Sequence, residues 1–316
     1  MRIVFMGTPE FAVPSLKSLI DGGWNVEAVV TQPDRPRGRG HRVSFSPIKE
    51  AAVEAGLKVL QPEKVSEESF MKLLEELSPD VIVVVAFGQL IPPAILEIPP
   101  YGCINVHASL LPRYRGAAPI QQAIIDGCRV TGVTTMLLDE GWDTGDILLQ
   151  EQVMIEPEDT AGSLEMKLAE AGAQLLCETL RRLARGDLKP TPQDETEATY
   201  AYRLKKSAGE ISWEANARQV VDLVRGVNPW PGAYTYHRGQ MLKVWEAAEV
   251  DQEADGAQPG TVLGITDDGI VITCGSGSVL LKVVQPPNRP RMGGRDYANG
   301  YRVEPGELLG GASTDA

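Results

Sequence analysis

The stretch DVIVVVAFG, residues 80–88, is the clearest indication of the fold of this chain. Between Asp80 and Gly88 every residue is apolar, without the polar-apolar alternation of a half-exposed strand. Such a run is typical of a strand buried on both faces, as in parallel sheets covered by helices. Apolar runs at residues 2–7 and 26–31 alternate with stretches of helical periodicity. The sequence therefore predicts an α/β fold with a Rossmann-like, mostly parallel sheet in its N-terminal domain.

The pattern changes after residue 186. Residues 187–207, DLKPTPQDETEATYAYRLKKS, contain two prolines and several acids but no periodic apolar face, which is typical of a linker. Beyond them, short strand-like runs are separated by turns containing glycine. We therefore expect a catalytic domain over 1–186, a linker over 187–207, and an OB-like β-barrel domain over 208–316.

Composition limits the possible partners. The formal net charge of −13 argues against nucleic acid binding over the whole surface. The segment PDRPRGRGHR, residues 33–42, is nevertheless locally basic. No apolar stretch approaches the roughly 18 residues of a membrane helix, and no secretory signal is evident, so we expect a cytoplasmic protein without a membrane partner. We also expect a monomer. We expect no metal, because the scattered cysteines and three histidines do not have the spacing of metal ligands.

Candidate catalytic side chains occur in INVHASLLP, residues 104–112. Asn105 and His107 are two residues apart and would share one face of a strand. They would lie at the carboxyl end of a parallel strand, where ligands bind in such sheets. A structural hydrogen-bonded pair is the alternative, but we expect the apolar turn that follows to be exposed, which favours a site. Cys103 shares this face, and we expect it to be a core residue rather than a catalytic thiol.

An acidic loop, LDEGWDTGDIL at residues 138–148, offers carboxylates that could orient an imidazole. Spacing alone does not select which of its acids does so, and a solvated acidic turn is the alternative. Metal binding is less favoured, because the spacing of the oxygen ligands does not match an EF-hand loop.

HASLLPRYRGAAPIQ together with DEGWDTGDIL resembles the 10-formyltetrahydrofolate-dependent formyltransferases, in particular their bacterial members acting on methionyl-tRNA. The resemblance covers nearly the whole chain, since MRIVFMGTPEFA, TQPDRPRGRG, VVVAFGQLIP and NPWPGAYT also match. Two departures affect the edge of the expected pocket. Tyr114 stands where tryptophan is common, and Trp142 where a smaller apolar residue is common.

The resemblance implies specific roles for individual residues. It implies that Asn105, His107 and Asp143 are catalytic, and that Arg39 is the best candidate for a direct tRNA contact in the basic loop. Three neighbouring arginines could equally steer phosphates. The formyl-folate signature falls on Ser109, Leu110, Leu111 and Pro112. The arginines that neighbour Arg39 in the basic loop are Arg35, Arg37 and Arg42.

The implied reaction transfers a formyl group from 10-formyltetrahydrofolate, as co-substrate, to the α-amino group of methionyl-initiator tRNA. A basic strip in the C-terminal domain could face the RNA or be an ordinary solvated surface; its members are Lys205, Lys206, Arg289, Arg291 and Arg295.

Three alternatives remain. The chain could formylate an amino sugar-nucleotide or another small amine, or it could be an RNA-binding protein with a relic folate site. A nucleotide-dependent oxidoreductase is disfavoured, because GTPEF at residues 7–11 lacks the G-x-G-x-x-G fingerprint.

Overall fold

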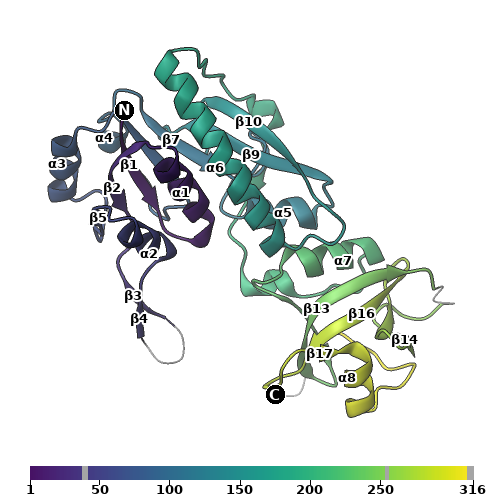
Figure 1. The fold of residues 1–316 in the computed structure, drawn as a ribbon. Helices are drawn as coiled ribbons and strands as arrows, with labels where there is room; N and C mark the ends of the chain where they lie inside the picture. The colour runs from purple at the N-terminus through teal and green to yellow at the C-terminus, as the bar shows by residue number, and fades with distance from the viewer. Residues whose placement is uncertain (38–41, 253–255, 312–316) are drawn as a thin grey trace. The chain divides into compact units, whose positions relative to one another are not determined.

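The computed structural model describes residues 1–37, 42–252 and 256–311 (Figure 1). Its contacts divide the chain into two compact units, which are described separately. Unit 1 comprises 1–119, 130–154 and 165–201, and unit 2 comprises 120–129, 155–164 and 202–316. Among the helices of the described residues, none combines the length and apolarity needed to cross a membrane.

Unit 1 is built on a seven-stranded sheet with the order β10-β9-β7-β6-β1-β2-β5. The five strands from β7 to β5 run parallel to one another, whereas β9 is antiparallel to β7 and β10 is antiparallel to β9. This arrangement confirms the predicted mostly parallel sheet, with the apolar run after Asp80 as its fully buried strand β6. The strands are β1 (Arg2–Gly7), β2 (Asn25–Val30), β5 (Val59–Leu60), β6 (Val81–Val85), β7 (Cys103–His107), β9 (Val130–Leu137) and β10 (Ile147–Met154).

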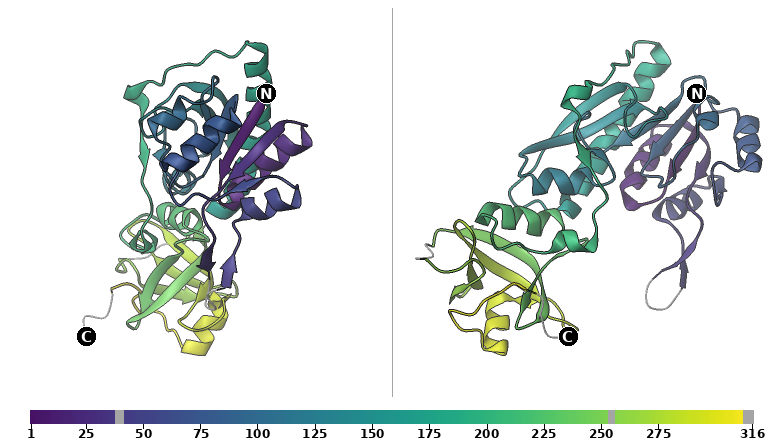
Figure 2. Two further views of the ribbon diagram at one scale, coloured as in Figure 1. Left: turned by 90° about the vertical axis from the view of Figure 1, so that its left-hand side faces the viewer. Right: turned by 180° about the vertical axis from the view of Figure 1, so that it is seen from behind.

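Apolar helix faces cover this sheet on both sides. On one side Phe70, Leu74 and Ile95 pack with Val84 and Cys103 in a single core cluster. On the other side the long helix α6 runs along the sheet, as Figures 1 and 2 show. The helices are η1 (Glu10–Ala12), α1 (Val13–Asp21), α2 (Pro47–Glu54), α3 (Glu68–Leu77), α4 (Pro93–Leu96), α5 (Pro119–Ile125), α6 (Ala161–Arg185) and η2 (Glu195–Glu197).

Two small strand pairs accompany the main sheet, and neither was predicted. The first is an antiparallel hairpin that carries the basic loop, and the second is a parallel pair that brings two distant segments together. They consist of β3 (Arg35–Arg37) with β4 (Arg42–Ser44), and of β8 (Arg115–Gly116) with β11 (Tyr200–Ala201).

Unit 2 contains an antiparallel sheet with the strand path β12-β13-β16-β15-β14, and β17 pairs with β16. Leu309 and Leu308 form bridges to His237 and Thr261, so the last described segment contacts strands at both ends of this path. A separate antiparallel domain agrees with the predicted C-terminal β fold. Its elements are η3 (Lys206–Gly209), α7 (Ala217–Gly226), β12 (Ala233–His237), β13 (Gln240–Val250), β14 (Val262–Ile265), β15 (Ile270–Thr273), β16 (Ser278–Gln285), β17 (Met292–Gly293) and α8 (Gly294–Tyr301).

A polar network around the buried His237 ties this last segment to β12. His237 contacts the Tyr297 hydroxyl through Nδ1 at 2.7 Å and the Glu307 carboxylate through Nε2 at 2.9 Å. Arg238 donates two hydrogen bonds to the same carboxylate. Burial by itself raises the pKa of Glu307, but the hydrogen bonds from Arg238 and His237 outweigh it and bring that pKa down to about 2.

We expect Glu307→Gln to lower Tm at pH 7, because the neutral amide loses the charge-assisted bonds to Arg238. A depressed carboxyl pKa contributes stability that is present above the unfolded-state value of about 4.3 and is lost as pH falls toward 2. The Tm difference from wild type should therefore shrink as the pH is lowered through this range in calorimetry. Glu246→Gln, at an exposed position of β13, is the matched control and should leave Tm unchanged. A deficit that is equal at pH 7 and pH 3 would contradict the linkage.

Candidate active site

Strand β7 presents Asn105 and His107 on one face of the sheet of unit 1. It pairs with β6 in parallel and with β9 in antiparallel, and Asn105 lies between Val84 and Met136. His107 is 7% exposed and Asn105 is half-buried. Among the described residues, none forms a hydrogen bond with the side-chain amide of Asn105. That amide therefore keeps an N–H donor available at the carboxyl end of a parallel strand.

Cys103 occupies the same face but belongs to the core. Its side chain is buried in the cluster with Ile95, and burial raises the pKa of its thiol to about 12. The thiol is thus protonated at neutral pH, as expected of a core residue and not of a nucleophile.

Both ring nitrogens of His107 face oxygen atoms of the protein. Nε2 lies 3.0 Å from the backbone carbonyl oxygen of Tyr114, and Nδ1 lies 3.7 Å from Oδ2 of Asp143. A carbonyl oxygen only accepts hydrogen bonds, so Nε2 carries the hydrogen of the neutral ring. Nδ1 then holds the free lone pair, and a proton taken up there gives a cation that faces the Asp143 carboxylate.

The two groups that contact His107 come from unusual backbone positions. Tyr114 has φ +59° and Asp143 has φ +55°, in the left-handed region that side-chain-bearing residues seldom adopt. Oδ2 of Asp143 also accepts a hydrogen bond of 2.8 Å from the backbone N–H of Gly116. Backbone strain of this kind collects at functional sites, where surrounding contacts hold it in place.

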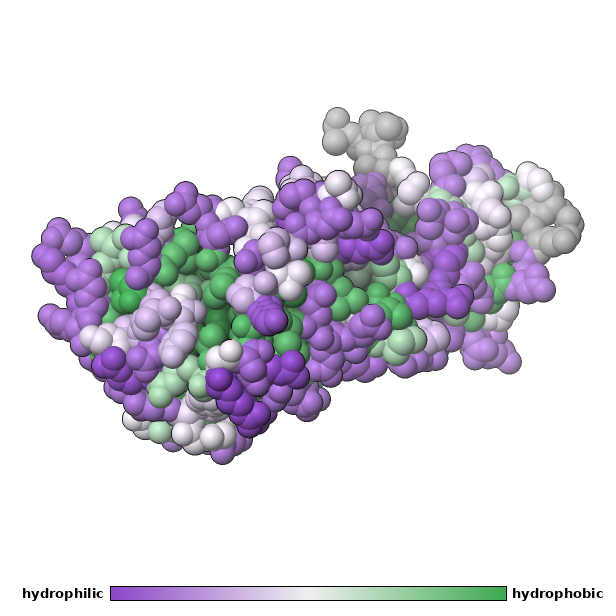
Figure 3. Space-filling view, turned by 90° about the horizontal axis from the view of Figure 1, so that it is seen from above, coloured by the Kyte–Doolittle hydropathy of each residue, from purple (hydrophilic) through white to green (hydrophobic). Residues whose placement is uncertain are grey.

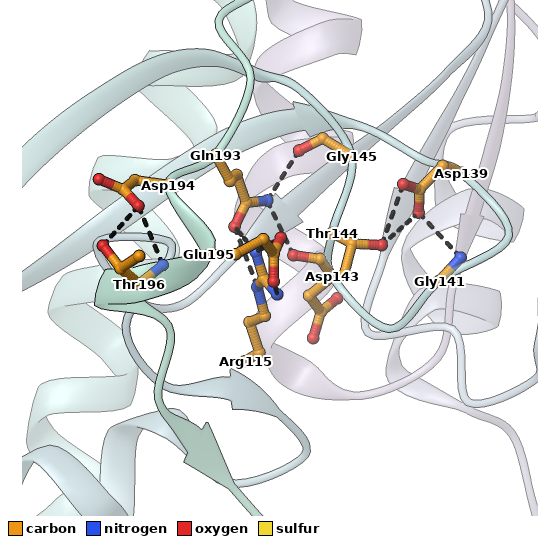
Figure 4. Close-up of polar contacts among 10 residues, drawn as sticks. All are labelled: Arg115, Asp139, Gly141, Asp143, Thr144, Gly145, Gln193, Asp194, Glu195 and Thr196. Carbon is orange, nitrogen blue, oxygen red and sulfur yellow. Dashed lines mark hydrogen bonds and ion pairs between the residues drawn. The ribbon is translucent and has the colours of Figure 1, made fainter.

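Folding of the acidic loop selects one carboxylate. Because β9 is antiparallel to β7, its last residue, Leu137, pairs with Ile104, three residues before His107. The loop therefore turns back along the sheet to bring Asp143 to His107. Asp139 instead accepts hydrogen bonds from Thr144 and from the backbone of Gly141 (Figure 4).

The turn after His107 is more buried than the exposed turn that we expected. Ser109 and Leu111 are buried, whereas Leu110 and Pro112 are half-buried. The Ser109 hydroxyl donates to the carbonyl of Arg113 at 2.6 Å. Polar side chains of β9 and β10 cover the turn's backbone, since the Thr134 hydroxyl donates to the Ser109 carbonyl and Gln150 to the Leu111 carbonyl. Within residues 109–112, Leu110 and Pro112 are thus the side chains that remain accessible to a ligand.

Large apolar side chains are exposed in loops of unit 1. Leu90, in the loop after β6, is 74% exposed, and Trp142, next to Asp143, is 62% exposed. Figure 3 shows apolar residues at the surface among hydrophilic ones on the face seen from above. Trp142 therefore adds an exposed aromatic surface beside Asp143.

The basic loop is held at its base. Asp34, directly before β3, forms an ion pair with Lys49 of α2 and accepts a hydrogen bond of 2.9 Å from Gln61. Hydrogen bonds from Lys49 and Gln61 lower the pKa of Asp34. Arg35 is exposed. Arg37 and Arg42 pair across the hairpin through their backbones, and Arg39 lies outside the described residues.

The predicted basic strip of unit 2 is exposed at all five positions. The Arg291 guanidinium stacks 3.5 Å above the Trp245 ring, a cation–π arrangement. Arg295 forms an ion pair with Asp267. No group of three or more His, Cys, Asp or Glu side chains in the described part of the chain is arranged to hold a metal ion.

Several groups at this site could not be inferred from sequence. The Tyr114 carbonyl and the Gly116 N–H are backbone atoms, which every residue carries. Arg115 is fully buried and Gln193 contacts the Asp143 loop from a segment that resembles a linker. Of these positions, Gly116 is the one whose residue type indicates an unusual backbone conformation in the sequence. Its φ is +117°, and an added Cβ would come 2.7 Å from the Ala201 carbonyl oxygen.

Comparison with known proteins identifies the family of the chain. Residues 1–180 match the family model "Formyl transferase", and residues 203–302 match "Formyl transferase, C-terminal domain". A methionyl-tRNA formyltransferase from Caldanaerobacter subterraneus subsp. tengcongensis is 52% identical, and one from Acetivibrio thermocellus is 50% identical. Each alignment covers 98% of this chain and 100% of the relative.

A solved structure shares the fold. An N-formyltransferase from Helicobacter canadensis, in complex with folinic acid and dTDP-3-aminofucose, superposes with a TM-score of 0.66 at 17% identity. The match covers 89% of this chain and 98% of that one. Sequence matches over both domains and full-length relatives at about half identity lead to one conclusion. This chain belongs to the formyl transferase family.

Proposed function

We propose that the protein transfers a formyl group from 10-formyltetrahydrofolate to the α-amino group of methionyl-initiator tRNA. The observation that carries this proposal is the full-length match, at 50–52% identity, to proteins named methionyl-tRNA formyltransferase. The cluster of Asn105, His107 and Asp143 supports it, because each has a role in acyl transfer to an amine.

Asn105 is proposed to stabilise the oxyanion. When the amine attacks the formyl carbon, the carbonyl oxygen gains negative charge in a tetrahedral intermediate. The free amide N–H of Asn105 can donate to that oxygen, and such a donor typically contributes about 3–4 kcal/mol to the transition state.

His107 is proposed to move the proton. A new C–N bond forms to the α-amino nitrogen, and its extra proton passes to Nδ1, because Nε2 is held by the Tyr114 carbonyl. The Asp143 carboxylate stabilises the resulting cation from 3.7 Å. His107 then returns the proton to N10 as the old C–N bond breaks, so tetrahydrofolate leaves with a neutral amine at N10 rather than an amide anion. The step as written uses neither a metal nor a covalent enzyme intermediate.

The folate is proposed to bind along the turn of residues 109–112. Leu110 and Pro112 can offer apolar surface to the pterin ring, while the buried Ser109 and Leu111 shape the turn. The Ser109 hydroxyl is already used by the Arg113 carbonyl, so we assign it to the turn's geometry rather than to a folate hydrogen bond.

The basic loop is proposed to bind the tRNA, with Arg39 in direct contact and Arg35, Arg37 and Arg42 on phosphates. We retain the predicted division into a catalytic domain (1–186), a linker (187–207) and a tRNA-binding domain (208–316). The separate family matches to 1–180 and 203–302 support this division. A monomer located in the cytoplasm is part of the same proposal.

Arg39→Ala is expected to raise KM for methionyl-tRNA while KM for the folate stays within about twofold. Loss of one phosphate contact should also reduce the salt slope of tRNA binding by about one unit. Steady-state kinetics with each substrate varied, repeated across salt concentrations, measure both. Arg181→Ala, an exposed arginine of α6, is the control. An unchanged KM and salt slope would remove Arg39 from the RNA contact.

The assay that tests the function supplies 10-formyltetrahydrofolate with methionyl-initiator tRNA, beside amino sugar-nucleotides and other small amines. We expect rapid transfer to the charged tRNA alone. Transfer only to a small amine would reject the tRNA substrate while keeping formyl transfer, and no transfer to any amine would reject the enzyme assignment.

A further inference from the structure

Residues 191–201, here called the strap, return from α6 onto both loops that contact His107. At one end, Thr191 exchanges two backbone hydrogen bonds with Ile147, at the end of the acidic loop. At the other end, Thr199 accepts from the backbone of Arg115, and its hydroxyl accepts from the backbone of Tyr114 at 2.8 Å. One short segment therefore holds the loop of Tyr114 and the loop of Asp143 in fixed register.

Gln193 is the side chain of the strap that contacts the acidic loop. Its Nε2 donates to the carbonyl oxygens of Asp143 at 2.8 Å and Gly145 at 2.7 Å (Figure 4). Its Oε1 accepts from Nε and from one terminal nitrogen of Arg115 at 3.0 and 2.9 Å. Both amide hydrogens and the amide oxygen are thereby used, which fixes the orientation of the amide.

Arg115 orients Gln193 from a fully buried position. Its guanidinium also forms a bidentate pair with Glu195 at 2.9 and 2.7 Å. Burying a guanidinium is costly unless its donors are paired, and here Gln193 and Glu195 accept hydrogen bonds from Nε and both terminal nitrogens of Arg115. Arg115 lies between Tyr114, whose carbonyl contacts His107, and Gly116, whose N–H contacts Asp143.

We propose that Gln193, oriented by Arg115 and Glu195, is a positioning residue that holds Asp143 in its left-handed conformation against His107. The proposal rests on the function proposed above, because it assigns Gln193 a role in that reaction. Without the two bonds from Gln193, the carbonyl oxygens of Asp143 and Gly145 lose the side chain that holds them, and among the described residues the Asp143 carboxylate keeps only its hydrogen bond from Gly116. The carboxylate then leaves the ring of His107, and turnover falls although neither substrate has lost a contact.

The test is Gln193→Glu, which is nearly isosteric. The carboxylate still accepts from Arg115, but it cannot donate and it faces two carbonyl oxygens at hydrogen-bond distance. A misplacement of about 1 Å can cost about 100-fold in rate, so we expect kcat to fall by about 10- to 100-fold. KM for both substrates should stay within about twofold, and the variant should remain folded at the assay temperature, which a melting curve checks. Thr196→Ala, a solvent-facing change on the same strap, is the matched control and should leave kcat unchanged.

A double-mutant cycle separates positioning from general loosening. If Gln193 acts through Asp143, adding Gln193→Glu to Asp143→Asn should lower kcat by no more than about twofold further. The proposal would be overturned if Gln193→Glu lowered kcat by the same factor in the wild-type and Asp143→Asn backgrounds. It would also be overturned if the single variant kept its kcat or changed only KM. The wild-type arm reports the proposed function independently. If wild type formylates only a small amine, the cycle is run with that acceptor and still decides the role of Gln193.

Discussion

His107→Ala is expected to reduce kcat by about 10²–10⁴-fold with methionyl-tRNA as acceptor. The variant lacks the lone pair of Nδ1. The proton of the attacking nitrogen therefore loses the acceptor that lies next to the Asp143 carboxylate. The ring is nearly buried and contacts the protein through Tyr114 and Asp143. KM for the folate should therefore change little, which single-turnover rates and folate titration would measure separately.

His107→Gln is the matched control for this prediction. A glutamine amide can still donate to the Tyr114 carbonyl, but it has no basic nitrogen. We expect it to preserve Tm better than alanine does and yet to lose the same part of kcat. Recovery of near wild-type turnover in the glutamine variant would show that His107 holds the loop and does not transfer a proton.

Asn105→Ala is expected to lower kcat by about 10²–10³-fold, equivalent to about 3–4 kcal/mol of lost transition-state stabilisation. The amide has no hydrogen-bond partner among the described residues, so its removal breaks no bond of the folded protein there. Tm should accordingly stay close to that of wild type, and the loss should fall on kcat and kcat/KM equally.

Asn105→Asp tests the same donor without changing its size. The carboxylate cannot donate and places negative charge where the oxyanion would form, so this variant should be at least as slow as alanine. Rates are to be compared at saturating folate and tRNA. An aspartate variant that keeps more than a tenth of wild-type kcat would contradict an oxyanion role for Asn105.

Much of the fold could be predicted from the sequence, because burial leaves a period in the pattern of apolar residues. The uniformly apolar run after Asp80 became the buried strand β6, and alternation around Asn105 correctly placed this residue and His107 on one face. Elements without that pattern were missed. The helix α8 has the sequence GRDYANGY, with two glycines inside it, and the hairpin β3–β4 consists largely of arginine and proline.

The sequence identifies which residue types could act, since an amide, an imidazole and carboxylates each have a chemistry that does not depend on context. How these groups act depends on the packing of the folded chain. It turned the acidic loop back so that Asp143 and not Asp139 faces His107, and it placed a carbonyl against Nε2, which leaves Nδ1 to accept the proton. It also brought Gln193 to a carbonyl 50 residues earlier in the chain. The physical reason is that these choices depend on backbone groups common to every residue, whose positions are set by packing between distant segments.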